Sequence, residues 1–285
     1  MAEPARCRAV VVTAIALAGA VIMGWTASAV QRPAAGRDEI PRTTDGKPNL
    51  SAPAPRLPDG TPDLSGVWQG GGPIGDISEG LAPGETIQLL PAARKILDSR
   101  ASKDDPEANC LPTGVPRIAP YPWRIVQTPT HRRATHMFFL FEANIHSYRQ
   151  IFMDGRKHPA DPDPTWYGHS IGRWEGDTLV VDTVGYNDKF WFDFRGHPHT
   201  ERLRTVERWT RKNYSTLENK VTIDDPGAYS RPFTVTFTAR LAPGEELLEY
   251  ICQENNQDVD HIQGPTAPPG DPDRTPGTLG TRTVK

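Results

Sequence analysis

Short runs of apolar and β-branched residues, separated by turn residues, follow one another from Trp123 onward. In Thr234-Val-Thr-Phe-Thr238 the alternation is strict, which places Val235 and Phe237 on one face of a strand and the threonines on the other. The acidic turn Glu175-Gly176-Asp177 between two such runs predicts a β-hairpin. Besides the hairpin, the pattern predicts strands at 123–127, 137–142, 147–153, 204–210, 217–223, 233–241 and 246–252.

The spacing of these strands indicates the fold class. Nine strands repeating about every 8 to 14 residues, joined mostly by short turns, favour an all-β antiparallel meander that closes into a lipocalin-like barrel. A β-sandwich is the alternative. One helix is predicted near the start of the domain, from Pro91 to about Asp104, because proline suits the first helical position and alanine and arginine favour helix.

The two ends of the chain differ from its middle. Arg6 and Arg8 precede an apolar run and the small residues Ala27-Ser28-Ala29, which predicts a signal peptide at 1–29. A retained membrane anchor is the alternative, since the run reaches about 17 residues. Residues 30–62 are rich in Pro, Arg, Asp and Gly and are expected to be a flexible leader. The β-barrel domain then spans 63–262, and a disordered tail spans 263–285.

A short repeat lies within the leader. Asp45-Gly-Lys-Pro-Asn-Leu-Ser51 is echoed 14 residues later by Asp59-Gly-Thr-Pro-Asp-Leu-Ser65. Two copies are too few for a solenoid. The second copy continues into Trp68, which marks the start of the packed domain.

Charge and cysteine content narrow the range of partners. Cleavage after Ala29 would change 32 basic and 35 acidic residues to 30 and 34, a net charge of 30 − 34 = −4. A weakly acidic chain without a basic cluster argues against nucleic acid, and against membrane contact beyond the export signal. Cleavage would also leave Cys110 and Cys252, for which an oxidising compartment favours one disulfide over two separate buried thiols. The oligomeric state stays open.

The stretch from Trp166 to Trp209 is the candidate functional segment, because it holds four tryptophans, three histidines and many carboxylates. A histidine that titrates near neutral pH can act as general base when a carboxylate orients it or serves as the acid. The candidate catalytic residues are His169, His197, His199, Asp182, Asp188 and Asp193. The candidate substrate contacts, mostly aromatic, are His146, Tyr148, Trp166, Tyr167, Tyr186, Asn187 and Trp191.

A metal site is a separate hypothesis. His197, His199 and Glu201 occupy alternate positions, so in an extended segment all three would lie on one face as a facial triad for Zn²⁺ or Fe²⁺. The alternative is that the imidazoles cap a loop and bond to backbone carbonyls. No cofactor is favoured. The proline- and aspartate-rich loop from His158 to Pro164 is a candidate lid over a pocket mouth.

Five motifs resemble an abundant family of exported bacterial proteins. The resemblance covers about Asp63 to Asp258 and implies export and a single β-rich domain, but it carries over no catalytic residue. The motifs are Asp63-Leu-Ser-Gly-Val-Trp68, Asp105-Pro-Glu-Ala-Asn-Cys110, Gln150-Ile-Phe-Met-Asp-Gly155, Gly168-His-Ser-Ile-Gly-Arg-Trp-Glu-Gly-Asp-Thr-Leu-Val-Val-Asp-Thr183 and Gly196-His-Pro-His199.

These patterns favour a periplasmic or secreted enzyme. The expected chemistry is acid–base catalysis by histidine and carboxylate on a small cyclic or sugar-derived substrate, as in a lyase, isomerase or hydrolase. One alternative is a non-catalytic carrier whose barrel holds an apolar ligand, and another is a metal-dependent enzyme at His197, His199 and Glu201. The polar central segment favours an enzyme, because a carrier of apolar ligands would line its barrel with aliphatic side chains.

Overall fold

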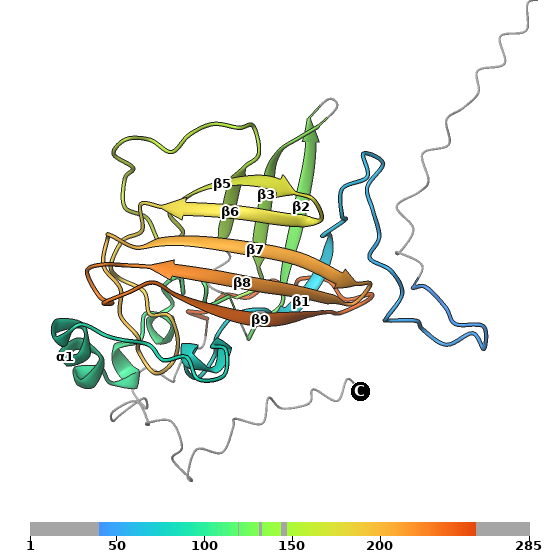
Figure 1. Cartoon of the computed structure of the whole chain (residues 1–285). Helices are drawn as coiled ribbons and strands as arrows, with labels where there is room; N and C mark the ends of the chain where they lie inside the picture. Colours follow the sequence, from blue (N-terminus) through green and yellow to red (C-terminus); the bar gives the residue numbers. More distant parts are fainter. Residues whose placement is uncertain (1–39, 119, 131–132, 144–146, 255–285) are drawn as a thin grey trace, which may run out of the picture. The chain divides into compact units, whose positions relative to one another are not determined.

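Nine strands form one closed barrel in the computed structural model, which describes residues 40–118, 120–130, 133–143 and 147–254 (Figure 1). Each strand pairs with the next along the chain, and β9 pairs with β1. The predicted all-β barrel is therefore confirmed. The strands are β1 (Gly66–Gly70), β2 (Trp123–Thr130), β3 (Arg133–Phe141), β4 (Tyr148–Phe152), β5 (His169–Glu175), β6 (Thr178–Val184), β7 (Arg204–Asn213), β8 (Thr216–Asp224) and β9 (Phe233–Leu241).

The meander departs from the antiparallel pattern at one place. β4 and β5 run parallel, with Ile151 opposite Ser170 and Phe152 opposite Ile171. Parallel neighbours need a long crossover connection, and residues 153–168 provide it. This connection contains His158 and the prolines of the candidate lid, and Nδ1 of His158 lies 2.9 Å from Nδ1 of His169 at the start of β5.

The ninth strand comes from a different part of the chain than the sequence predicts. Residues 246–252 form no strand, and β1 closes the barrel instead. Trp68 of β1 lies opposite Trp123 of β2 and Leu241 of β9. Because β1 pairs with both β2 and β9, neither strand keeps an open edge for a strand from the C-terminal segment. The prediction of a strand at 246–252 was wrong for this reason.

The two clearest local predictions hold. Glu175 of β5 lies opposite Thr178 of β6, so Gly176 and Asp177 form a two-residue hairpin loop, and Gly176 has a φ of +58°. Helix α1 (Pro91–Ser99) begins at the expected proline. It ends before Asp104, which belongs to the short 3₁₀ helix η2 (Ser102–Asp104). Two further 3₁₀ turns are η1 (Ile77–Gly80) and η3 (Glu107–Asn109).

Large side chains occupy the interior of the barrel. The rings of Trp123, Phe139 and Trp209 lie with centroids 5.4 Å apart in each pair, and Trp68 stacks on Trp123 at 6.5 Å. All four are fully buried. A second interior group is polar. Arg149 forms a 2.5 Å ion pair with Glu207 and also donates to the hydroxyl groups of Ser170 and Thr183. The two buried charges therefore compensate each other.

The short repeat before β1 folds as two similar turns. Arg42 donates to the carbonyl of Gly46 (2.7 Å), and 14 residues later Arg56 donates to the carbonyl of Gly60 (2.9 Å). The second copy is attached to the barrel, because Arg56 also forms an ion pair with Asp177 in the β5–β6 turn.

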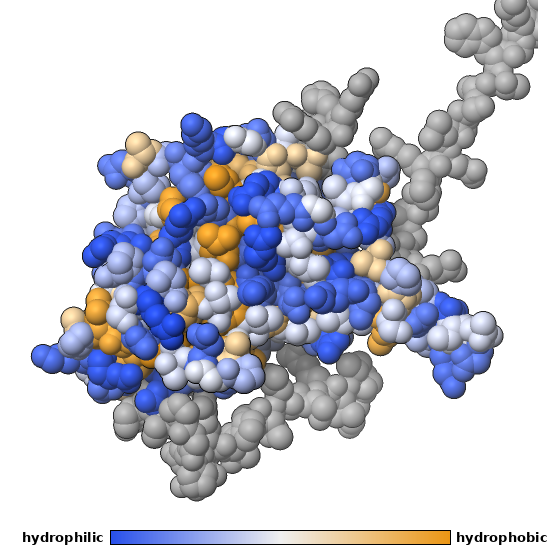
Figure 2. Space-filling view, in the orientation of Figure 1, coloured by the Kyte–Doolittle hydropathy of each residue, from blue (hydrophilic) through white to orange (hydrophobic). Residues whose placement is uncertain are grey.

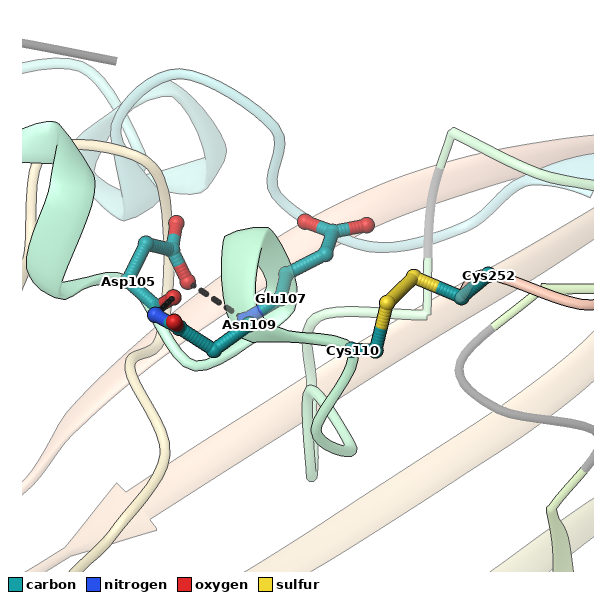
Figure 3. The surroundings of a disulfide bond; sticks show 5 residues. All are labelled: Asp105, Glu107, Asn109, Cys110 and Cys252. Atoms are coloured by element: carbon teal, nitrogen blue, oxygen red, sulfur yellow. Dashed lines mark hydrogen bonds between the residues drawn. A yellow bond between two sulfur atoms is a disulfide. The ribbon is translucent and has the colours of Figure 1, made fainter. Parts of the chain in front are cut away.

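The predicted disulfide joins Cys110 to Cys252, whose Cα atoms are 5.6 Å apart (Figure 3). Asn109, beside Cys110, donates to the backbone carbonyl of Asp105. Arg117 binds the carboxylates of Asp105 and Glu107, so the proline-rich segment before β2 is fixed by charge pairs as well as by the covalent bond.

The outer face seen in Figure 2 is largely hydrophilic, with smaller apolar patches between charged side chains. Within the described residues, no helix is long and apolar enough to cross a membrane. The predicted signal peptide (1–29) and tail (263–285) lie outside the described residues.

Candidate functional site

The candidate residues divide between two places in the structure. His169 and Asp182 lie near the β4–β5 connection, on β5 and β6. Asp193 and His197 lie in the long loop between β6 and β7. The two groups differ in burial and in access to solvent.

A surface hollow of about 580 Å³ lies beside the β4–β5 connection. Three of the expected substrate contacts line it, namely Tyr148, Trp166 and Tyr167. Tyr148 is 59% exposed, so its ring presents a face to solvent. The other lining residues include the aromatic side chains Phe152 and His169 and the polar side chains Ser147, Gln150, Asp163 and Thr165. Aromatic faces beside polar groups suit a small cyclic ligand.

His169 belongs to a chain of three titratable groups. Its Nδ1 lies 2.9 Å from Nδ1 of His158, and Nε2 of His158 lies 3.8 Å from the Asp182 carboxylate. In a bond between two imidazole nitrogens one must donate a proton and the other must accept it. When His158 carries its proton on Nε2, which lies 3.8 Å from Asp182 and makes no hydrogen bond to a described residue, its Nδ1 accepts from Nδ1 of His169. Nε2 of His169 then carries a lone pair.

Neighbouring residues determine the charges of His169 and Asp182, the two ends of this chain of contacts. Burial, with smaller contributions from His158 and Arg156, lowers the pKa of His169, so this imidazole is neutral near pH 7. The hydrogen bonds from Arg204 lower the pKa of Asp182, which therefore stays ionised. A neutral imidazole next to a second imidazole and an ionised carboxylate has the composition of a general-base site.

A second hollow of about 680 Å³ is also lined by the β4–β5 connection. His158 lines this second hollow, whereas His169 lines the first. Pro159 and Pro162 line both, so the candidate lid borders each hollow. Tyr186 and Glu201, two other candidate residues, line the second hollow.

The second group of candidates centres on a buried aspartate. Oδ2 of Asp193 lies 2.7 Å from Nδ1 of His197 and accepts from the backbone N–H of Ile77. Oδ1 accepts from the backbone N–H groups of Gly196 and His197. Burial alone would raise the pKa of Asp193, but the hydrogen bonds from His197 and the backbone outweigh it, and the net effect lowers the pKa. Asp76 completes the group, 4.0 Å from Nδ1 of His197.

The expected His197, His199 and Glu201 triad does not form. The segment from His197 to Thr200 belongs to no strand, and both imidazoles are buried. His199 lies between Phe190 and Phe192, with ring centroids 3.8 and 5.1 Å away, and burial lowers its pKa to about 4. Glu201 is exposed. Among the residues that the structure describes, the three metal-ligating side chains whose ligand atoms lie within 4.8 Å of one another are Asp76, Asp193 and His197.

Among the described residues, the remaining candidates form no hydrogen bond or ion pair with His169, Asp193 or His197. Asp188 is exposed, Asn187 is buried and accepts from the backbone of Lys189, and Trp191 lies 4.6 Å beneath the guanidinium of Arg100. The hydroxyl of Tyr186 is turned towards Thr205. His146 lies outside the described residues.

Two residues of these groups were missed as site candidates. His158 precedes a proline in a loop, and only the parallel pairing of β4 with β5 brings it to His169. Asp76 lies in a glycine-rich connector more than a hundred residues before Asp193. The one local signal was Asp76-x-Ser78, which is typical of a capping turn, and the Ser78 N–H does donate to Asp76.

Comparisons with known proteins assign no relative. The chain matches no family model, no curated protein and no solved structure. The described residues define a closed β-barrel with a disulfide between Cys110 and Cys252.

Proposed function

We propose that the protein is an exported enzyme in which His169 acts as general base on a small cyclic substrate bound in the aromatic hollow. The observation that carries this proposal is the 2.9 Å contact between Nδ1 of His169 and Nδ1 of His158, with Asp182 behind His158. The reaction type is that of a lyase, isomerase or hydrolase, each of which needs a proton removed from substrate or water.

The proton pathway follows from the tautomers. Nε2 of His169 takes a proton from the substrate or from a water molecule. The proton on Nδ1 of His169 then moves towards Nδ1 of His158, so the positive charge spreads over both rings. The Asp182 carboxylate, 3.8 Å from His158, stabilises that charge, and Arg204 keeps the carboxylate ionised. Return of the proton to the product restores the starting state.

The aromatic and amide side chains of the hollow support a ring-shaped substrate. Tyr148 and Trp166 offer flat faces, and Gln150 and Thr165 offer neutral hydrogen-bonding groups. Flat faces combined with neutral polar groups suit the ring and hydroxyl groups of a sugar derivative or a related cyclic compound. The disulfide and the N-terminal sequence pattern support export to an oxidising compartment.

The contents of the barrel favour this enzyme over the carrier alternative. A carrier of lipocalin type holds its ligand inside the barrel. Here Trp68, Trp123, Phe139 and Trp209 lie in contact inside it, and the Arg149 ion pair is fully buried. The surface hollow beside His169 is the better place for a ligand.

The test is turnover of a panel of cyclic carbohydrates, lactones and phenolic compounds in D₂O, followed by ¹H NMR. Solvent deuterium incorporation or a new product identifies a compound on which the protein acts. For that compound, His169→Gln is expected to lower kcat about 100-fold or more, the usual contribution of a general base. Trp166→Ala should mainly raise KM, because its ring binds without reacting.

Asp188→Asn is the matched control, since Asp188 is an exposed candidate residue that lines neither hollow. It should leave both constants unchanged. An unchanged kcat in His169→Gln would remove His169 from the mechanism. If no compound is turned over and none shifts the NMR signals of His169 or Trp166, the hollow is not a substrate site.

A further inference from the structure

Three buried side chains from two distant loops meet beside the barrel. Asp76 is 4% exposed, Asp193 is fully buried and His197 is 6% exposed. Asp76 caps η1, and the other two residues belong to the loop between β6 and β7. The acid–base mechanism at His169 uses none of them.

His197 contacts both carboxylates, with its Nδ1 2.7 Å from Asp193 and 4.0 Å from Asp76. Arg100 and Arg117 attract the charge of Asp193 at longer range, but Arg100 donates to the carbonyl of Gly196 and Arg117 pairs with Asp105 and Glu107. A divalent cation held between two buried carboxylates would stabilise both of their charges directly.

Backbone donors already hold the carboxylates in place. Asp193 accepts from the N–H groups of Ile77, Gly196 and His197, and Asp76 accepts from the N–H of Ser78. Such bonds orient carboxylates in metal sites as a second shell of contacts. The three ligand atoms lie within 4.8 Å of one another.

We propose that Asp76, Asp193 and His197 bind one divalent cation of the Zn²⁺ class. Tetrahedral Zn²⁺ with ligands at about 2.1 Å holds its donor atoms about 3.4 Å apart. The distances from Nδ1 of His197, 2.7 Å to Asp193 and 4.0 Å to Asp76, lie on either side of that value. Small side-chain shifts therefore suffice. Mixed nitrogen and oxygen ligands suit Zn²⁺ and its neighbours rather than Ca²⁺.

Binding moves a proton within the His197 ring. Without the ion, the 2.7 Å bond to Asp193 places the proton on Nδ1. A neutral imidazole that ligates through Nδ1 carries its proton on Nε2 instead. The ion thus replaces the Nδ1 hydrogen bond, while Asp193 keeps its three backbone bonds. The ion would tie η1 to the β6–β7 loop, and three protein ligands would leave its fourth position to a water molecule.

The experiment uses the whole mature protein after treatment with a chelator, with Zn²⁺ as the probe. Calorimetric titration should give one ion per chain, and Zn²⁺ should raise the Tm. Long-range ¹H–¹⁵N NMR should show the His197 ring changing from the Nδ1-protonated to the Nε2-protonated form. Asp76→Asn should weaken binding at least tenfold, and far-UV circular dichroism checks its fold. His197→Gln should abolish binding.

Two variants serve as controls. Asp188→Asn removes an exposed carboxylate of the same loop, and His169→Gln removes the other histidine pair as a possible zinc site. Both should keep full affinity. Binding that is lost in His169→Gln but kept in Asp76→Asn overturns the proposal. So does a His197 ring that keeps its Nδ1 proton at saturating Zn²⁺, or a Kd weaker than about 1 mM.

Discussion

At the scale of single residues, His199 shows how burial can keep an imidazole neutral. The imidazole lies between two phenylalanine rings, and its Nε2 makes no hydrogen bond to a residue that the structure describes. Its Nδ1 lies 3.3 Å from the carbonyl of Thr200, which is a weak partner. Without a nearby carboxylate in contact, desolvation is the largest influence and keeps the ring neutral.

This burial predicts a loss of stability in mild acid. The pKa of His199 is about 4 in the folded protein and about 6.5 in the unfolded chain. Between these values the unfolded chain binds a proton that the folded protein does not, so stability falls as the pH drops from 6.5 to 4. The expected loss is about 3 kcal/mol. The free energy of unfolding should be measured with urea at intervals through this pH range. It should fall less steeply with decreasing pH for His199→Gln than for the wild type.

Equal slopes in the two proteins would mean that His199 is protonated in the folded state. The comparison isolates this residue, because the other histidines titrate in both proteins alike.

At the scale of elements, the segment between η3 and β2 depends on one glycine. Gly114 has a φ of +66°, and an added Cβ would lie 2.4 Å from the ring of Phe190. The segment can therefore cross the β6–β7 loop closely only if this position has no side chain. Phe190 is fully buried, so its ring has no room to move away.

Alanine substitutions at Gly84 and Gly114 separate the steric clash with Phe190 from the free-energy cost of the left-handed backbone. Gly84 also has a positive φ, +84°, but no atom lies within 4 Å of an added Cβ. Both Gly84→Ala and Gly114→Ala should lose about 1 kcal/mol from the left-handed backbone. Gly114→Ala should lose a further 1 to 3 kcal/mol, roughly, from overpacking against Phe190. Urea denaturation measures the difference, and equal losses would show that the segment shifts freely.

Elements were predicted well where the signal is local and poorly where it is not. The β5–β6 hairpin depends on Gly176 and its neighbours in sequence, and α1 begins at its proline. By contrast, the choice between Gly66–Gly70 and 246–252 for the ninth strand depends on how β2 and β9 are paired, which no local pattern encodes. The five-residue β1 is also too short for a clear alternation.

The candidate site residues were also predicted best where they are close together in sequence. Asp193 and His197 are four residues apart, so the sequence could place them together, and both were candidates. Their partner Asp76 and the partner of His169, His158, come from loops that only the folded barrel brings near. The aromatic lining from Trp166 to Tyr167 was predicted because it is contiguous with β5.

At the scale of the whole molecule, the disulfide is the main covalent constraint. It links residues 142 positions apart. The chain-entropy model gives about 5 kcal/mol of stabilisation for a loop of this length. The double variant Cys110→Ser/Cys252→Ser should therefore unfold at a clearly lower urea concentration than the wild type. Addition of a reductant should lower the midpoint of the wild type and leave the variant unchanged. Coincident midpoints without reductant would show that the unfolded chain is already compact.

The position of the disulfide has a consequence for how the barrel is assembled. The bond closes a covalent ring from Cys110 to Cys252, and β2 to β9 all lie within that ring. β1 is the one strand outside it, inserted between the two ends of an eight-strand sheet. A single cut between Gly84 and Pro91 would therefore convert the protein into a two-piece complex. β1 would then belong to a separate peptide that binds between β2 and β9, and the closure of the barrel would depend on the concentration of the two pieces.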